Sequence, residues 1–135
     1  MKNEKLKVIN LNFEMMKENI VANKSIEFAI KIVSICKSIV EEQKEFVLSK
    51  QLLRSGTAIG ALIREAEHAE STADFIHKMN IALKEANETD YWLLLLLKGN
   101  YLSKILYNQI QQDCIELIRL LASIVKTTKQ KLQKH

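Results

Sequence analysis

Four side chains that could bind a metal ion lie close together in the sequence. Glu65 and His68 form a Glu-x-x-His motif, and Asp74 and His77 repeat its spacing. In helical bundles, such motifs hold two metal ions between core helices. The ligands then project inward from the middle of their helices, whereas these four flank a turn expected near residue 70. We therefore predict no metal site, and a metal-dependent enzyme is the least favoured alternative.

Residue types that perform acid–base or nucleophilic catalysis are also present. Glu85, Glu88 and Asp90 cluster in one segment, and paired carboxylates can act as acid and base. Such carboxylates more often pair with cations, for which the candidates are Arg54, Lys78 and Lys84. Ser55 has no histidine near it in the sequence to act as its base. We predict neither an enzymatic activity nor a cofactor.

The last part of the chain is strongly basic. The formal net charge is +4, and residues 98–135 contribute seven basic and two acidic groups. Excess positive charge can bind the phosphate backbone of RNA or DNA. The alternative is a solvated helix end, where the helix dipole favours cations. The candidate nucleic-acid-binding residues are Lys98, Lys104, Arg119, Lys126, Lys129 and Lys131.

The composition limits the kind of element that can position these residues. The chain has 135 residues, of which 47% are hydrophobic, with three glycines and no proline. It is too hydrophobic for a disordered chain and too poor in turn-forming residues for a β-sandwich. Cys36 and Cys114 stand among apolar residues with no C-x-x-C pair, which indicates buried free thiols. We predict a soluble, all-α domain.

Hydrophobic periodicity predicts four helices. They run over about 25–42, 45–70 and 71–97, and from 103 toward the C-terminus. The connections are short, which favours antiparallel neighbours and hence an up-and-down four-helix bundle. We assign residues 1–22 to an N-terminal arm of unspecified conformation and residues 23–135 to the bundle domain.

Local signals mark several helix ends. Ser25 is the expected N-cap of the first helix. Ser71, with Asp74 three residues later, resembles a capping box at the start of the third. The dipeptide at 99–100, Gly followed by Asn, is the expected stop of that helix.

Small residues interrupt the second predicted helix. Gly56 and Gly60 are four residues apart, so they share one side of a helix. Each costs roughly 1 kcal/mol relative to alanine, but the lack of a side chain lets another backbone come close. We predict tight helix packing at these two glycines; a groove for a ligand backbone is the alternative. A phosphate-binding loop is not expected, because the glycines lie inside a periodic segment.

The predicted helices carry more apolar surface than a single bundle needs. The first has one stripe through Ile26 and Val33 and a second through Phe28 and Ile35. The five leucines at 93–97 point in every direction around the third, so we expect burial on all sides, within the fold or against another subunit. Such an excess favours self-association.

The sequence shows no targeting or membrane segment. Polar residues interrupt the N-terminal region, and the longest apolar run, 91–97, is far below the roughly 20 residues that span a bilayer. We expect a cytoplasmic location and no membrane partner.

Five segments of the sequence are distinctive. They are NKSIEFA at 23–29, QLLRSGTAIGA at 51–61, ADFIHKM at 73–79, IALKEA at 81–86 and ETDYWL at 88–93. Through these segments, the chain resembles the "four helix bundle protein" family, whose members are also called 23S rRNA intervening-sequence proteins. The similarity covers roughly residues 20–125. The chain departs from the family pattern at Ala58 and Leu62, where family members often have Ser and Asn.

This resemblance implies an up-and-down bundle, ring-like homopentamers and no established enzymatic activity. Some members are encoded inside intervening sequences of ribosomal RNA genes. Relatives serve as accessory proteins of diversity-generating retroelements, where they bind a reverse transcriptase and nucleic acid. We therefore expect a non-enzymatic homo-oligomer, a pentamer by this resemblance, that is a scaffold associated with RNA or DNA. The alternative is a protein–protein interaction module whose basic end is incidental.

Overall fold

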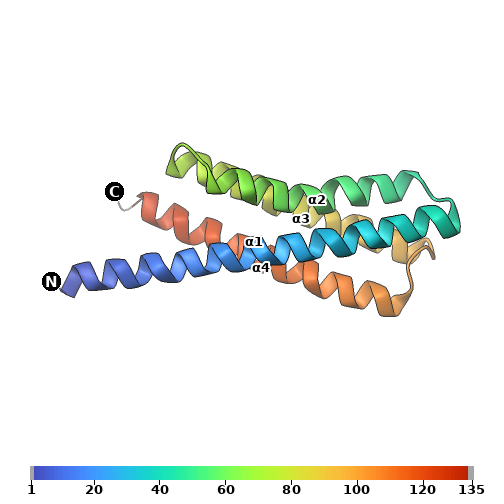
Figure 1. Ribbon diagram of the computed structural model, residues 1–135, viewed down its shortest axis with the longest axis horizontal. Helices are drawn as coiled ribbons and strands as arrows, with labels where there is room; N and C mark the ends of the chain where they lie inside the picture. Colours follow the sequence, from blue (N-terminus) through green and yellow to red (C-terminus); the bar gives the residue numbers. More distant parts are fainter. Residues whose placement is uncertain (1, 134–135) are drawn as a thin grey trace.

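The described residues form four long helices joined by three short turns. The computed structural model describes the backbone of residues 2–133 and the side chains of residues 17–133. The helices are α1 (Lys2–Gln43), α2 (Val47–Glu67), α3 (Thr72–Lys98) and α4 (Lys104–Gln133). Consecutive helices run antiparallel and pack together, and α4 closes against α1 (Figure 1). The predicted up-and-down four-helix bundle is confirmed.

The first helix is much longer than its periodicity indicated. It begins at Lys2, so the prediction that Ser25 is an N-cap is wrong. Ser25 lies inside α1, is buried, and donates its hydroxyl to the carbonyl oxygen of Ala22 at 2.7 Å. No glycine or proline interrupts residues 2–43, which explains why the helix continues. The division into an arm of residues 1–22 and a bundle of residues 23–135 stays a prediction, although α1 crosses that boundary unbroken.

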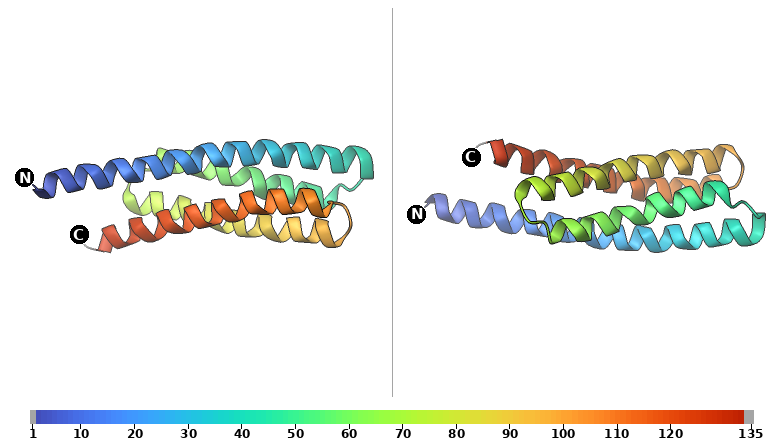
Figure 2. Two further views of the ribbon diagram at one scale, coloured as in Figure 1. Left: turned by 90° about the horizontal axis from the view of Figure 1, so that it is seen from below. Right: turned by 90° about the horizontal axis from the view of Figure 1, so that it is seen from above.

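The extra length projects from one end of the bundle. In the two views of Figure 2, the first turns of α1 extend beyond the α2–α3 turn, and the end of α4 lies on the same side. At the opposite end, α1 contacts the α3–α4 turn, because Gln43, the last residue of α1, donates a hydrogen bond to the Tyr101 carbonyl oxygen at 2.7 Å. The bundle is therefore tied at one end and extended at the other.

Side-chain caps fix where α2 and α3 begin. The Ser71 hydroxyl accepts from the Asp74 backbone N–H at 3.0 Å, which confirms the predicted capping residue. For α2 the cap is Glu45, whose carboxylate accepts from the backbone N–H groups of Val47, Leu48 and Ser49 at 2.8–2.9 Å. These three bonds hold the pKa of Glu45 below its ordinary value, although partial burial works in the opposite direction.

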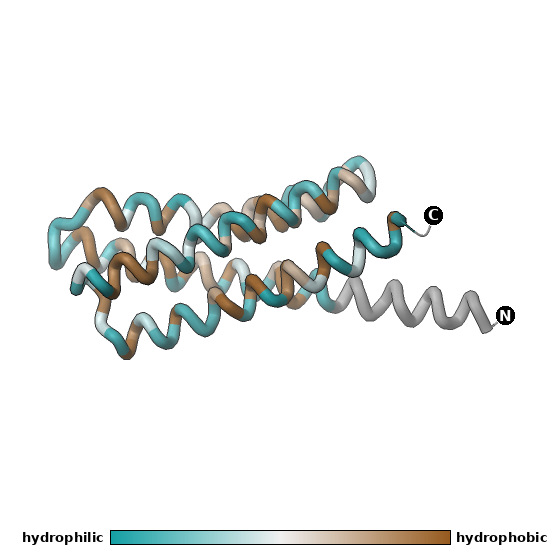
Figure 3. The backbone as a smooth tube through the Cα atoms, turned by 180° about the vertical axis from the view of Figure 1, so that it is seen from behind, coloured by the Kyte–Doolittle hydropathy of each residue, from teal (hydrophilic) through white to brown (hydrophobic). Residues whose placement is uncertain are grey.

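Hydrophobic residues occur along every described helix (Figure 3). The core side of α1 is the second of the two sequence stripes, which includes Phe28, Ile32 and Ile35, all buried. The leucine run of α3 is not covered on every side within one chain. Leu93 and Leu96 are fully buried, whereas Leu94 is 40% exposed.

The two glycines of α2 face α1 at close range. A Cβ atom on Gly56 would lie 2.9 Å from Cγ2 of Ile32, and one on Gly60 would lie 3.2 Å from the Ser25 hydroxyl oxygen. Both distances are shorter than ordinary van der Waals contact. The α1–α2 spacing therefore depends on the missing side chains.

We predict that Gly56→Leu destabilises the bundle by about 1–3 kcal/mol, because the side chain would have to displace Ile32. Urea unfolding followed by circular dichroism measures the change. Ala61→Leu is the matched control, since it adds a larger side chain at an exposed position of the same helix. Equal unfolding free energies for the two variants would show that the glycine side of α2 is open.

Candidate functional site

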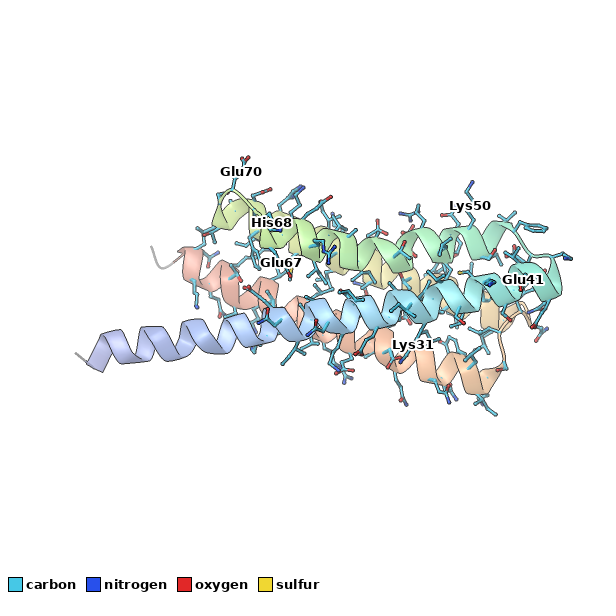
Figure 4. The ribbon with its side chains drawn as sticks, viewed as in Figure 1. Lys31, Glu41, Lys50, Glu67, His68 and Glu70 are labelled. Atoms are coloured by element: carbon cyan, nitrogen blue, oxygen red, sulfur yellow. The ribbon has the colours of Figure 1, made fainter. Side chains whose placement is uncertain are left out.

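The four residues considered as metal ligands lie around the α2–α3 turn. His68 and Glu70 mark this turn in Figure 4, and His68 and His77 are both exposed. Glu65 pairs instead with Lys78, at 3.3 Å between Oε2 and Nζ, and Asp74 belongs to the cap of α3. Among the side chains of residues 17–133, no group of three or more histidine, cysteine or acidic residues is placed to hold a metal ion.

The acidic cluster of α3 faces a cation on α2. Arg54 donates to both carboxylate oxygens of Glu85 at 3.3 Å and also forms an ion pair with Glu88. Burial raises the pKa of Glu85, Glu88 raises it further, and Arg54 lowers it. Beneath this pair, the hydroxyls of Ser55 and Thr89 lie 3.0 Å apart in the core. The cluster is thus a polar link that aligns α2 with α3.

The third acidic residue of that segment, Asp90, faces α4. Its Oδ1 atom is buried and has no hydrogen-bond partner among the described atoms. Burial raises the pKa of Tyr107, and it raises the pKa of the Cys114 thiol to about 12. The negative charge of Asp90 shifts both pKa values in the same direction. The three carboxylates are therefore divided between two helix interfaces, with Glu85 and Glu88 facing α2 and Asp90 facing α4.

Both cysteines are buried free thiols, as predicted. Cys36 donates to the Ser49 carbonyl oxygen and Cys114 to the Ala86 carbonyl oxygen, each at 3.3 Å. Burial raises the pKa of Cys36 to about 11. At neutral pH both groups stay protonated, and a thiol is a far weaker nucleophile than a thiolate.

The six candidate nucleic-acid-binding residues do not form one patch. Lys98 ends α3 and Lys104 begins α4 at the tied end of the bundle. The remaining candidates, Arg119, Lys126, Lys129 and Lys131, are on the distal half of α4. Lys104 and Lys131 are 27 residues apart in one helix, about 40 Å at 1.5 Å per residue.

Three of these six share one exposed side of α4. Arg119 and Lys126 are seven residues apart, Lys129 follows three residues later, and all three are exposed. We call these three residues the basic row. Lys131 is half-buried and, only two residues beyond Lys129, lies on a different side of the helix.

The acidic residues of α4 are engaged elsewhere. The helix has only two, Asp113 and Glu116. They pair with Lys31 and Lys24 of α1, each at 2.8 Å (Lys31 is labelled in Figure 4). Both pairs lie on the side of α4 that meets α1. Glu116 lies three residues before Arg119, at the start of the basic row, and residues 117–133 of α4 contain no acidic residue.

A second exposed feature is an apolar stripe on the outer side of α1. Ile26, Ile30 and Val33 recur every three or four residues and are 47%, 64% and 49% exposed. We call them the outer stripe. Ile26 and Val33 belong to the first of the two stripes found in the sequence, and Ile30 was in neither, so only part of that first stripe faces solvent in the single chain.

Grooves flank the outer stripe on both sides. Between α1 and α2, Val33, Val40 and Leu53 line a groove of about 360 Å³. Between α1 and α4, a groove of about 430 Å³ is lined by residues that include Ile30 and Leu106. The stripe and its two grooves form a broad and mainly apolar surface, of the kind that marks interaction sites.

A smaller apolar patch lies on α3. Tyr91 and Leu94, three residues apart, are 53% and 40% exposed, and we call them the α3 patch. The Tyr91 ring packs edge-on against Trp92, with ring centroids 5.2 Å apart. Because α1 and α3 each pack between α2 and α4, they occupy opposite corners of the bundle. The outer stripe and the α3 patch therefore face in opposite directions.

A family model described as 23S rRNA-intervening sequence protein matches residues 17–123. The chain belongs to this family. A search of curated proteins finds no match. A solved structure from the S23 ribosomal protein family of Bacteroides thetaiotaomicron VPI-5482, a protein of unknown function, is 60% identical and has a TM-score of 0.80. The similarity covers 82% of this chain and 98% of that chain.

Membership confirms the resemblance seen in the five sequence segments, and the fold is that of the solved relative. Within the described helices, no stretch is both long and apolar enough to cross a membrane. The family match begins at residue 17, which leaves the first turns of α1 outside the shared bundle.

We predict that Arg54→Met costs about 1 kcal/mol or less at pH 7, because the ion pair is half exposed. Without Arg54, the already raised pKa of Glu85 rises further. When the pKa of a carboxyl group is higher in the folded state than in the unfolded state, the group stabilises the fold at pH values below its unfolded-state pKa. This stabilisation is lost as the pH rises through the pKa of the folded state. The cost should therefore be smaller at pH 4 than at pH 7, as measured by urea unfolding.

Glu85→Gln in the Arg54→Met background is the control for this effect. It removes one of the two carboxyls that pair with Arg54, so the difference between pH 4 and pH 7 should become smaller. A cost of Arg54→Met that is the same at both pH values would contradict an electrostatic role for this residue.

Proposed function

We propose that this protein is a non-enzymatic, self-associating scaffold that binds nucleic acid through the basic row. The observation that carries the proposal is the exposure of the outer stripe, Ile26, Ile30 and Val33, in the single chain. Covering this stripe with another copy produces an oligomer, and the oligomer presents the basic row several times.

The arrangement of apolar surfaces supports an assembly in which one copy follows another. Contacts between two different patches of the same chain are heterologous and close into rings when the rotation fits. The outer stripe and the α3 patch are two such patches at opposite corners. A ring in which the outer stripe of one copy meets the α3 patch of the next covers both. Five copies remain the expectation that follows from the family resemblance.

The electrostatic part of the proposal depends on residues 117–133 of α4, which contain no acidic residue. Three exposed cations in line can contact successive phosphates, and each contact releases counterions. One row is a weak site by itself. Repeating the row around an oligomer raises its effective concentration and hence the avidity for a long nucleic acid.

The groups that could do chemistry are engaged in packing or pairing. Arg54 binds the carboxylates of Glu85 and Glu88, and both thiols are buried with raised pKa values. These roles favour a scaffold over an enzyme.

We predict that Ile30→Glu weakens self-association at least about tenfold, because the oligomer would bury an unpaired charge at the outer stripe. Ile30 is 64% exposed in the single chain, so the fold itself should tolerate the change. Sedimentation velocity over a dilution series measures association, and circular dichroism verifies folding. Ala61→Glu, at an exposed position of α2, is the matched control. If the Ile30→Glu variant self-associates as strongly as this control, the proposed interface at the outer stripe is contradicted.

We further predict that replacing Arg119, Lys126 and Lys129 by glutamine weakens binding to RNA or DNA and lowers its salt dependence. If all three contact phosphate, the slope of log K against log salt should fall by about 2–3. Filter-binding titrations at several salt concentrations give this slope.

A charge-matched triple variant tests whether the location of these cations matters. Lys84, Lys98 and Lys104 are exposed on other parts of the surface, and replacing them by glutamine removes the same charge. The basic row would be contradicted as the site if the two triple variants lost the same amount of affinity. It would also be contradicted if the affinity did not depend on salt, or if no binding occurred at low salt. A protein partner that survives nuclease treatment in the absence of such binding would favour the interaction-module alternative.

A further inference from the structure

The exposed apolar residues of α1 and of α3 are flanked by charges of opposite sign. On the outer side of α1 the flanking residues are Glu27 and Glu41, and on the outer side of α3 they are Lys84 and Lys98. All four side chains are exposed, and none of them forms an ion pair with another described residue of its own chain. In each helix the two charges are 14 residues apart, which is two heptads, so they share one side of that helix.

Contacts inside the bundle show which residues of α1 and α3 lie at the same height. Gly56 of α2 faces Ile32 of α1, and the hydroxyl of the residue before Gly56 lies 3.0 Å from the Thr89 hydroxyl of α3. Ile32 is therefore level with Thr89. The hydrogen bond from Gln43 to the Tyr101 carbonyl oxygen gives the same relation to within one residue. Since α1 and α3 run in the same direction (Figure 1), each residue of α1 is level with the residue about 57 positions later on α3.

This relation brings the four charges together between neighbouring copies of a ring. Rotation about an axis that runs along the bundle leaves the height and the direction of every helix unchanged. The α1 helix of one copy then runs parallel to α3 of the next, with Glu27 level with Lys84. At the other end of the contact, Glu41 is level with Lys98. An acidic group therefore meets a basic group at both ends of the apolar contact.

We propose that two ion pairs between copies, Glu27 with Lys84 and Glu41 with Lys98, set the register of α1 against α3 of the next copy. The register rests on the self-association proposed above, because it specifies which surface covers the outer stripe. Charge pairs at the edge of an apolar contact contribute more to specificity than to affinity. The nucleic-acid titrations of the glutamine variant that includes Lys84 and Lys98 are accordingly made at a concentration at which sedimentation shows that variant to be assembled.

The residues between the two ion pairs fit the same register. Tyr91 comes level with residue 34 of α1, so its ring reaches the outer side of α1 between Ile30 and Lys37. Lys37 is exposed and comes level with Leu94, one turn after Tyr91. The lysine stem can cover this apolar residue while its ammonium group contacts the tyrosine ring. The remaining charge on this side of α1 therefore meets aromatic and aliphatic groups.

Contacts between two α1 helices lack this complementarity. If two α1 helices ran parallel at the same height, Glu27 and Glu41 would each lie beside their own copies. If they ran antiparallel about a point midway between the two carboxylates, Glu27 would lie opposite Glu41. Both arrangements bring like charges together, which disfavours association. The charges thus favour α3 of a second copy as the partner of the outer stripe.

Charge reversal tests the register, with sedimentation velocity over a dilution series at low salt as the measurement. Replacing Glu27→Lys together with Glu41→Lys should weaken self-association at least about tenfold, because like charges would meet at both ends of each contact. Lys84→Glu together with Lys98→Glu should have the same effect. The variant with all four reversals has the net charge of the wild type and should recover association to within about threefold of it. Circular dichroism verifies that each variant is folded.

Glu67→Lys together with Glu70→Lys is the matched control for charge. Both residues are exposed at the opposite end of the molecule from Glu41 (Figure 4), and this variant should associate as the wild type does. The register is overturned if neither double reversal in the contact weakens association more than this control, or if the fourfold reversal recovers nothing. A loss confined to the α1 reversal would overturn α3 as the covering surface. In each of these cases, weakening by Ile30→Glu would leave the proposed scaffold intact, whereas a monomeric wild type would overturn both.

Discussion

The structure depends on one helix that is hydrophobic on two opposite sides. The inner side of α1 carries Phe28 and Ile32 into the core, and its outer side carries Ile26, Ile30 and Val33. The two helices that pack against α1, which are α2 and α4, cover only its inner side. The outer side leaves apolar surface in water, and burial against another chain would remove this surface from water. The proposals of an oligomer and of a repeated basic row follow from this excess.

The core holds α1 in place by close packing and by a few polar links. Gly56 lets α2 approach Ile32 of α1, and Gly60 lets it approach Ser25. On the other side of α2, Arg54 joins the carboxylates of Glu85 and Glu88, which aligns α2 with α3. The ion pairs of α4 with Lys24 and Lys31 close the bundle. Glu85 and Glu88, which resemble a catalytic pair in the sequence, therefore serve helix alignment.

Much of the fold could be predicted from periodicity, because α2, α3 and α4 each bury one stripe of apolar residues. The start of α1 could not, because Ser25 is a good capping residue that lies here inside a helix. Periodicity also could not decide which of the two stripes of α1 is the core. The cap of α2 was missed because Glu45 acts from a position before the N-cap residue. The six basic residues were grouped by their nearness in sequence, yet a helix spreads them along its length.

The central claim is that α1 is covered on its outer side by another copy of this chain. Sedimentation equilibrium of the wild-type protein, over a wide range of concentration, tests it most directly. One chain has a mass of 15.5 kDa. The account predicts a species several times heavier that resists dilution. A mass of one chain at every concentration, with the helical fold intact, would contradict it.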